Sequence, residues 1–160
     1  MSEDNAITKD DLVVAIAKPL KQAHFVRRAA TWYRETEEIT VATQLRRSRF
    51  SGKHFLDIGI WLNKLQRTTY PRVQDCPIIT DLVKLYPEEY ERLASALTIE
   101  TASHDSLAFL SEFLTSHYVP YVTTIGTEKG LIRELTQGRL RRTAIVVGAD
   151  THLGVPSIRK

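Results

Sequence analysis

The sequence predicts an α+β domain: an antiparallel sheet of about four strands that follows an N-terminal helix, with helices packed on one face. Residues 31–62 contain three runs that alternate apolar and polar side chains and are joined by short polar turns. In most of the remaining chain, apolar residues recur every three or four positions, which is typical of helices. We expect residues 1–160 to form a single domain, with residues 1–7 and 155–160 as flexible ends.

The first predicted element is a helix over residues 9–23. Thr8 is a suitable N-cap, and the aspartates that follow it suit the positive end of the helix dipole. One apolar stripe should bury this helix against the sheet. Pro19 lacks a backbone donor and clashes with the preceding turn, so we expect a kink there or a helix that ends and restarts.

Three strands are predicted next, over residues 31–35, 38–47 and 54–62. The connections between them are short and polar, which favours antiparallel neighbours and a three-strand meander. One face of the second and third strands carries β-branched and aliphatic residues. The side chains predicted to face the core are Ile39, Val41, Leu45, Leu56, Ile58 and Ile60.

Helices dominate the second half of the predicted fold, after an irregular link between Pro71 and Pro77. We expect helices over residues 87–97, over 106–118 (ended by Pro120), and over 128–137 (capped by Thr127 and ended by Gly138). A fourth strand is predicted over residues 142–150.

Composition narrows the class of protein. The chain is 42% hydrophobic and 26% charged, which is typical of a globular protein, and no apolar run approaches the ~20 residues of a membrane helix. Cys76 is the only cysteine and the N-terminus is acidic, so we expect a cytoplasmic location, with no disulfide and no membrane contact. Net charge is +4 over residues 1–76, −5 over 77–126 and +4 over 127–160. This asymmetry indicates either internal charge matching or an electrostatically steered partner.

Six basic side chains are predicted to meet at one end of the sheet. Pairing the first two strands about the turn at 35–38 sets Arg27 near Arg46 and Arg28 near Leu45, with further cations in the next turn. The candidate residues for binding an anion or a partner are Arg27, Arg28, Arg46, Arg47, Arg49 and Lys53. The structural alternative is a solvated sheet edge, or pairing of these cations with the acidic helix at residues 88–91.

Aromatic residues lie on the same strands: Trp32, Tyr33, Phe55 and Trp61. They form either a platform on which nucleic-acid bases stack or, as is commoner for alternating aromatics, part of the core. Asp57 lies in mid-strand among apolar neighbours, where we expect Gln44 or Arg46 to satisfy it.

No catalytic residue, metal ligand or cofactor is assigned. The histidines are scattered without metal-ligand spacing: His24, His54, His104, His117 and His152. Cys76 follows an aspartate, which opposes thiolate formation, and a buried inert thiol is expected. Residues 126–130 lack the Gly-Lys-Ser/Thr ending of a phosphate loop, so we interpret them as a helix cap.

Three segments resemble a bacterial family of unknown function, domain of unknown function 4304. They are PLKQAHFVRRAATWYRE, TVATQLRRSRFSGKHFLDIGIWL and DCPIITDLVKL, and the resemblance extends from Leu12 to Leu85. The chain departs from the family pattern at His24, where a glycine is expected, and at Pro77, where a histidine is expected. An arginine expected soon after that histidine is replaced by Thr80 or Asp81. Any role that the family gives to the histidine and arginine is therefore in question for this chain.

The leading functional hypothesis is a non-enzymatic bacterial binding protein with a protein partner, of the kind that small immunity proteins represent. One alternative is a nucleic-acid or phosphate binder that uses the arginine cluster. The other is an enzyme whose site has no recognisable motif. The identity of the partner and the oligomeric state stay open.

Overall fold

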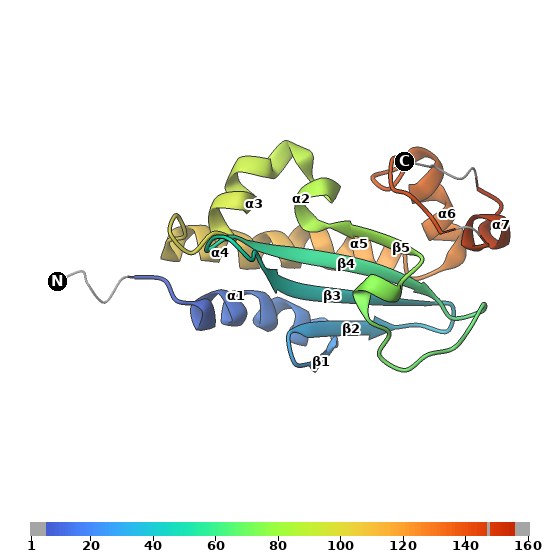
Figure 1. Ribbon diagram of the computed structural model, residues 1–160, viewed down its shortest axis with the longest axis horizontal. Helices are drawn as coiled ribbons and strands as arrows, with labels where there is room; N and C mark the ends of the chain where they lie inside the picture. Colours follow the sequence, from blue (N-terminus) through green and yellow to red (C-terminus); the bar gives the residue numbers. More distant parts are fainter. Residues whose placement is uncertain (1–5, 147, 156–160) are drawn as a thin grey trace.

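The computed structural model describes residues 6–146 and 148–155, which form an α+β fold with one antiparallel sheet in the order β1-β2-β3-β4-β5 (Figure 1). The chain begins with α1 (Lys9–Gln22), β1 (Val26–Arg28), β2 (Thr31–Glu35), β3 (Ile39–Arg47), β4 (His54–Leu62), η2 (Val73–Asp75) and β5 (Ile78–Asp81). It continues with α2 (Leu82–Leu85), η3 (Pro87–Glu89), α3 (Tyr90–Ala96), α4 (His104–Phe113), η4 (Leu114–Tyr118), α5 (Val119–Thr124), α6 (Glu128–Gln137) and α7 (Ala149–Leu153).

The predicted fold class and the three-strand meander are confirmed, since β2, β3 and β4 lie where the alternation placed them. The sheet has five strands rather than about four, because β1 and β5 add short edges. Neither edge strand has a strong sequence signal. β1 has three residues and all are exposed, while β5 has four and follows a proline-bounded link.

The strand predicted over residues 142–150 is wrong. Ile145 makes only an isolated bridge with Ile78, and the nearby Val146 N–H donates to the Pro77 carbonyl. Gly148 adopts a φ of 100°, and α7 begins at the next residue. The short apolar run therefore covers the start of the β5 edge without extending the sheet.

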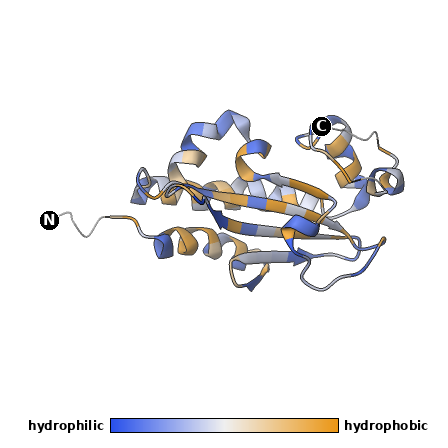
Figure 2. Cartoon of the chain, in the orientation of Figure 1, coloured by the Kyte–Doolittle hydropathy of each residue, from blue (hydrophilic) through white to orange (hydrophobic). Residues whose placement is uncertain are grey.

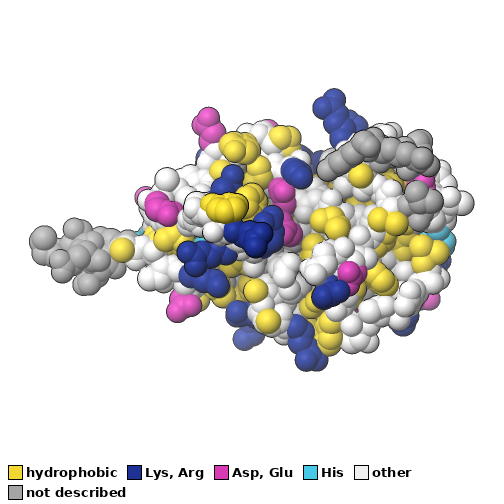
Figure 3. Space-filling view, in the orientation of Figure 1, with side chains coloured by type: hydrophobic (Ala, Val, Ile, Leu, Met, Phe, Trp, Pro, Cys, Tyr) yellow, Lys and Arg dark blue, Asp and Glu magenta, His cyan; other side chains and the backbone are white. Residues whose placement is uncertain are grey.

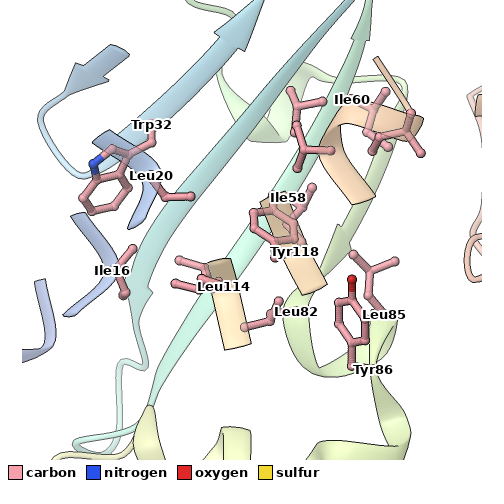
Figure 4. Close-up of a cluster of buried hydrophobic side chains, with 14 of the residues drawn as sticks. Ile16, Leu20, Trp32, Ile58, Ile60, Leu82, Leu85, Tyr86, Leu114 and Tyr118 are labelled. Atoms are coloured by element: carbon pink, nitrogen blue, oxygen red, sulfur yellow. The ribbon is translucent and has the colours of Figure 1, made fainter. Parts of the chain in front are cut away.

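The main core lies between the helices and one face of the sheet. All six residues predicted to face the core are buried there, and the apolar positions of β3 and β4 alternate along each strand in Figure 2. Figure 4 shows Ile58 beside Tyr118, with Trp32, Leu20 and Ile16 farther along the same layer. Tyr118 and Thr43 are both fully buried, and their hydroxyl oxygens lie 2.6 Å apart in a hydrogen bond.

Helix α1 starts at the predicted cap, with a capping box between Thr8 and Asp11. It continues through Pro19 to Gln22 as one helix, so the alternative of an end and restart is wrong. Pro19 has no N–H to donate to the Ala15 carbonyl, and the Ser111 hydroxyl of α4 donates to that carbonyl instead. A long-range contact thus satisfies the group that the proline leaves without its helical partner.

The helix predicted to stop at Pro120 instead passes through a π-helical turn, η4, and continues as α5. Pro120 occupies one of the first positions of α5, where its missing N–H is tolerated. The π-helical turn η4 lies directly before α5 in the chain. Both predicted caps of α6 are confirmed: Thr127 is its N-cap and Gly138 is its C-cap.

The second face of the sheet is covered over half its length by the segment 63–77. Val73 of this segment packs with Tyr33 and Ala42 of the sheet in a small separate cluster. Gly59 allows the close approach, since a Cβ there would lie 2.7 Å from the Cys76 Sγ. The half of this face nearer the β3–β4 turn has no such cover, and it carries the candidate site.

The expected flexible ends fall mainly on residues 1–5 and 156–160, which lie outside the described residues. Of the adjoining positions, Ile7 and Val155 are buried in the core. None of the helices within residues 6–146 and 148–155 has the length and apolar character needed to span a bilayer.

Candidate partner-binding surface

The open half of the second sheet face ends in the turn between β3 and β4. The strand register sets Gln44 beside Asp57 and Arg46 beside Phe55 on this face. The two strands then join through residues 48–53. We call residues 46–53 the basic turn and the uncovered half of the sheet the open face. Figure 3 shows dark blue basic side chains gathered on this side of the molecule, with hydrophobic side chains exposed among them.

Arg46 and Asp57 form the centre of the open face. The Arg46 Nε donates to Asp57 Oδ2 at 2.5 Å and a terminal nitrogen donates to Oδ1 at 3.3 Å, a two-pronged contact. The hydrogen bond with Asp57 raises the pKa of Arg46. The predicted partner of Asp57 is therefore confirmed as Arg46. The Arg46 guanidinium also lies over the Phe55 ring, with 4.4 Å between its Cζ and the ring centroid.

The basic turn is anchored by backbone hydrogen bonds to the segment after α3. The Ile99 N–H donates to the Gly52 carbonyl at 3.2 Å, and the His54 N–H donates to the Leu97 carbonyl at 2.9 Å. The Glu100 carboxylate packs against Gly52, where a Cβ would approach it to 2.3 Å. The turn is thus held to the segment that follows α3 rather than projecting freely.

Phe50, at the tip of this turn, is 93% exposed. Arg47 and Arg49 are exposed around it, while the Lys53 Nζ lies 5.0 Å from the centroid of the Phe55 ring. Sequence reasoning missed Phe50. The available signal was an aromatic residue flanked by serine and arginine in a polar turn, where no strand alternation accounts for it.

Most cations of this surface have no acidic partner. Within the described part of the chain, five of the six candidate residues form no ion pair: Arg27, Arg28, Arg47, Arg49 and Lys53. The structural alternative of pairing with the acidic helix is wrong, because Glu88 pairs with Arg139 at 2.7 Å and Glu89 with Arg92 at 3.5 Å. These five cations are therefore free of ion pairs with described residues, although the Glu100 carboxylate lies against Gly52 of the turn.

Arg27 and Arg28 do not lie where the sequence placed them. The chain reverses at Ala29, whose φ is 52°, so β1 folds back on β2 and Arg27 pairs with Trp32. Arg28 shares the open face with Arg46, but strand spacing and rise put their Cα atoms roughly 12 Å apart. Alanine seldom adopts a left-handed conformation, so the sequence did not indicate this chain reversal.

The two arginines of β1 instead pack on nearby aromatic rings. Arg27 lies over Trp32, with 5.1 Å from its Cζ to the ring centroid, and Arg28 lies over Tyr70 at 4.2 Å. The Arg27 Nε also donates to the Ala29 carbonyl at 2.8 Å and so supports the reversal. The structure therefore gathers Arg46, Arg47, Arg49 and Lys53 and leaves the β1 arginines along the sheet edge.

The aromatic platform is absent from the described surface, and the core interpretation is the better one. Trp32 is buried on the helix-covered face, and Tyr33 is buried beneath the segment 63–77. The Trp61 Nε1 donates to the Gln66 carbonyl at 2.6 Å. Phe55 does lie on the open face, but Arg46 and Lys53 both pack on its ring.

Cys76 is unsuited to nucleophilic chemistry. Its side chain is buried, and its thiol donates to the Arg72 carbonyl. Burial, together with the negative charge of Asp75, raises the pKa of the Cys76 thiol to about 12, so the thiolate is scarce at neutral pH. Among the residues the structure describes, no three histidine, cysteine, aspartate or glutamate side chains are grouped as metal ligands.

Comparison with known proteins gives no relative: no protein-family model matches the chain, and no curated protein or solved structure shows significant similarity to it. The resemblance to domain of unknown function 4304 therefore stays a prediction.

Proposed function

We propose that this chain is a non-enzymatic binding protein of the bacterial cytoplasm that recognises an acidic protein partner through the basic turn and the open face. The comparison with small immunity proteins is an analogy of size and α+β architecture. The proposal rests chiefly on Arg47, Arg49 and Lys53, which form no ion pair with a described residue and lie in the same turn as the exposed Phe50.

The combination of aromatic and arginine suits a protein interface. Aromatic residues and arginine are enriched at the centres of such interfaces, where one buried anchor supplies much of the binding energy. Unpaired cations around the anchor steer an acidic surface towards it and accelerate association. The backbone bonds between this turn and the segment after α3 reduce the entropy lost on binding.

A protein partner is favoured over nucleic acid because the surface lacks a stacking platform. Proteins that bind single strands without sequence preference use several aromatic rings in succession along a basic groove. Here Phe55 is already covered by Arg46 and Lys53, and Phe50 is the sole strongly exposed aromatic of the described basic turn.

The proposal is tested by titrating the full chain with poly-L-glutamate, an acidic polypeptide, and with a single-stranded oligonucleotide of matched charge. Arg47→Glu combined with Arg49→Glu should weaken poly-L-glutamate binding at least about tenfold at low salt. The affinity of the unaltered chain should fall as salt rises, because the Debye length shrinks from ~10 Å at 0.1 M to ~3 Å at 1 M.

Arg141→Glu combined with Arg142→Glu is the matched control. It makes the same change in net charge on exposed residues between α6 and α7, away from the β3–β4 turn (Figure 1). The control should bind poly-L-glutamate nearly as the unaltered chain does. Equal weakening by both variants would show that net charge alone acts and would overturn the proposed surface. Tighter binding of the oligonucleotide would favour the nucleic-acid alternative.

A further inference from the structure

A groove between α3 and α4 carries two exposed carboxylates, in contrast to the exposed cations of the basic turn. It encloses about 390 Å³, with Phe109 among its lining residues and the exposed carboxylates of Glu91 and Asp105 also lining it. Neither carboxylate forms an ion pair with a described residue. Arg92, which also lines the groove, pairs with Glu89 and lies over Phe109, with 3.7 Å between its Cζ and the ring centroid.

The groove and the basic turn complement each other chemically. The turn presents Phe50 among cations that form no ion pair with a described residue. The groove contains Phe109, with Arg92 stacked on its ring, and is rimmed by two carboxylates that likewise form no ion pair with a described residue. An exposed aromatic is typically accommodated in a pocket at an interface, and charges of opposite sign fix its orientation.

The two features are also neighbours on the molecule. Lys53 forms a β-bridge with Thr98, only two residues beyond the end of α3. α3 is seven residues long, so Glu91 lies roughly 10 Å back along its axis. Because the turn and the groove are adjacent, a two-fold axis between them brings each turn of a pair of molecules to the groove of the other.

We propose that two copies of this chain associate reciprocally, with Phe50 and the basic turn of each copy docked in the α3–α4 groove of the other. The contact is made twice, so the assembly closes as a dimer and does not extend into a filament. It uses the same turn as the proposed partner. The acidic partner must therefore compete with the second copy, and self-association regulates access to the binding surface.

The dimer itself does not depend on the proposed function, and a charge exchange tests it with the full chain alone. The turn-reversed variant carries Arg47→Glu and Arg49→Glu, and the groove-reversed variant carries Glu91→Lys and Asp105→Lys. Each variant alone opposes like charges in both contacts. In an equimolar mixture, both contacts of the mixed dimer again join opposite charges.

Sedimentation velocity at low salt measures this self-association. The unaltered chain, of 18.2 kDa, should sediment as a dimer at ~100 µM, a concentration suited to a modest interface. Each reversed variant should dimerise at least about tenfold more weakly, as should Phe50→Ala, whereas the mixture should regain the affinity of the unaltered chain. The control Arg141→Glu with Arg142→Glu should dimerise normally. Circular dichroism verifies that each variant is folded. Recovery of dimerisation in the mixture is a second check, because only folded variants can form the mixed dimer.

Two results would overturn this inference: a monomeric unaltered chain at that concentration, or two reversed variants that fail to associate when mixed. The proposed function is tested separately, by the binding of poly-L-glutamate. The groove-reversed variant keeps its basic turn free, so it should bind poly-L-glutamate at least as tightly as the unaltered chain. A dimer without poly-L-glutamate binding would retain the self-association and remove the acidic partner.

Discussion

The hydrogen bond between Tyr118 and Thr43 provides a sharp test of how the π turn is fixed to the sheet. Tyr118→Phe deletes the phenolic hydroxyl and leaves the Thr43 hydroxyl, in a residue that is 0% exposed, without its partner at 2.6 Å. Leaving such a buried group unsatisfied costs about 1–3 kcal/mol. Thr43→Val likewise leaves the buried Tyr118 hydroxyl without a hydrogen-bond partner, so it should lower the free energy of unfolding by a similar amount.

The double variant distinguishes a real hydrogen bond from two independent packing effects. With both polar groups removed, neither hydroxyl is left unsatisfied, so the double variant should lose less than the sum of the single losses by about 1 kcal/mol or more. Urea denaturation with an unchanged m-value measures each free energy. Strictly additive losses would show that the two hydroxyls do not interact and that Tyr118 contributes to the core by packing alone.

Two further predictions concern the core and the buried thiol. Ile58→Ala should lower the free energy of unfolding by about 2–5 kcal/mol through lost burial and a cavity. Ile79→Ala is the control: this residue lies on the adjacent strand β5 and is 44% exposed, so its loss should cost far less. Urea denaturation measures both values. Burial raises the pKa of Cys76 from 9.0 to about 12, so its contribution is complete below pH 9 and is lost as the pH rises towards 12. Cys76→Ala should flatten stability over that pH range, and an unchanged slope would contradict the assignment.

The sequence was sufficient for those elements whose signals are local. Alternation placed β2, β3 and β4, and side-chain caps placed the starts of α1 and α6, because each depends on neighbours a few residues apart. The failures depend on distant contacts. Ser111 satisfies the carbonyl that Pro19 leaves open, and Ile145 covers the β5 edge without forming a strand.

The candidate site was predicted in part for the same reason. Arg46, Arg47, Arg49 and Lys53 adjoin one turn, so strand pairing alone brings them together. Arg27 and Arg28 were misplaced because a left-handed Ala29 reverses the chain, which residue types do not indicate. The groove between α3 and α4 unites residues from two helices, and its charge becomes apparent only when they pack.

The basic turn and the open face together form the proposed binding surface. The most direct measurement is a series of ¹H–¹⁵N NMR spectra of the groove-reversed chain during titration with poly-L-glutamate. We expect the largest amide shifts in residues 46–53 and on the adjoining ends of β3 and β4. Shifts of equal size around residues 139–142, or shifts spread evenly over the basic surface, would contradict it.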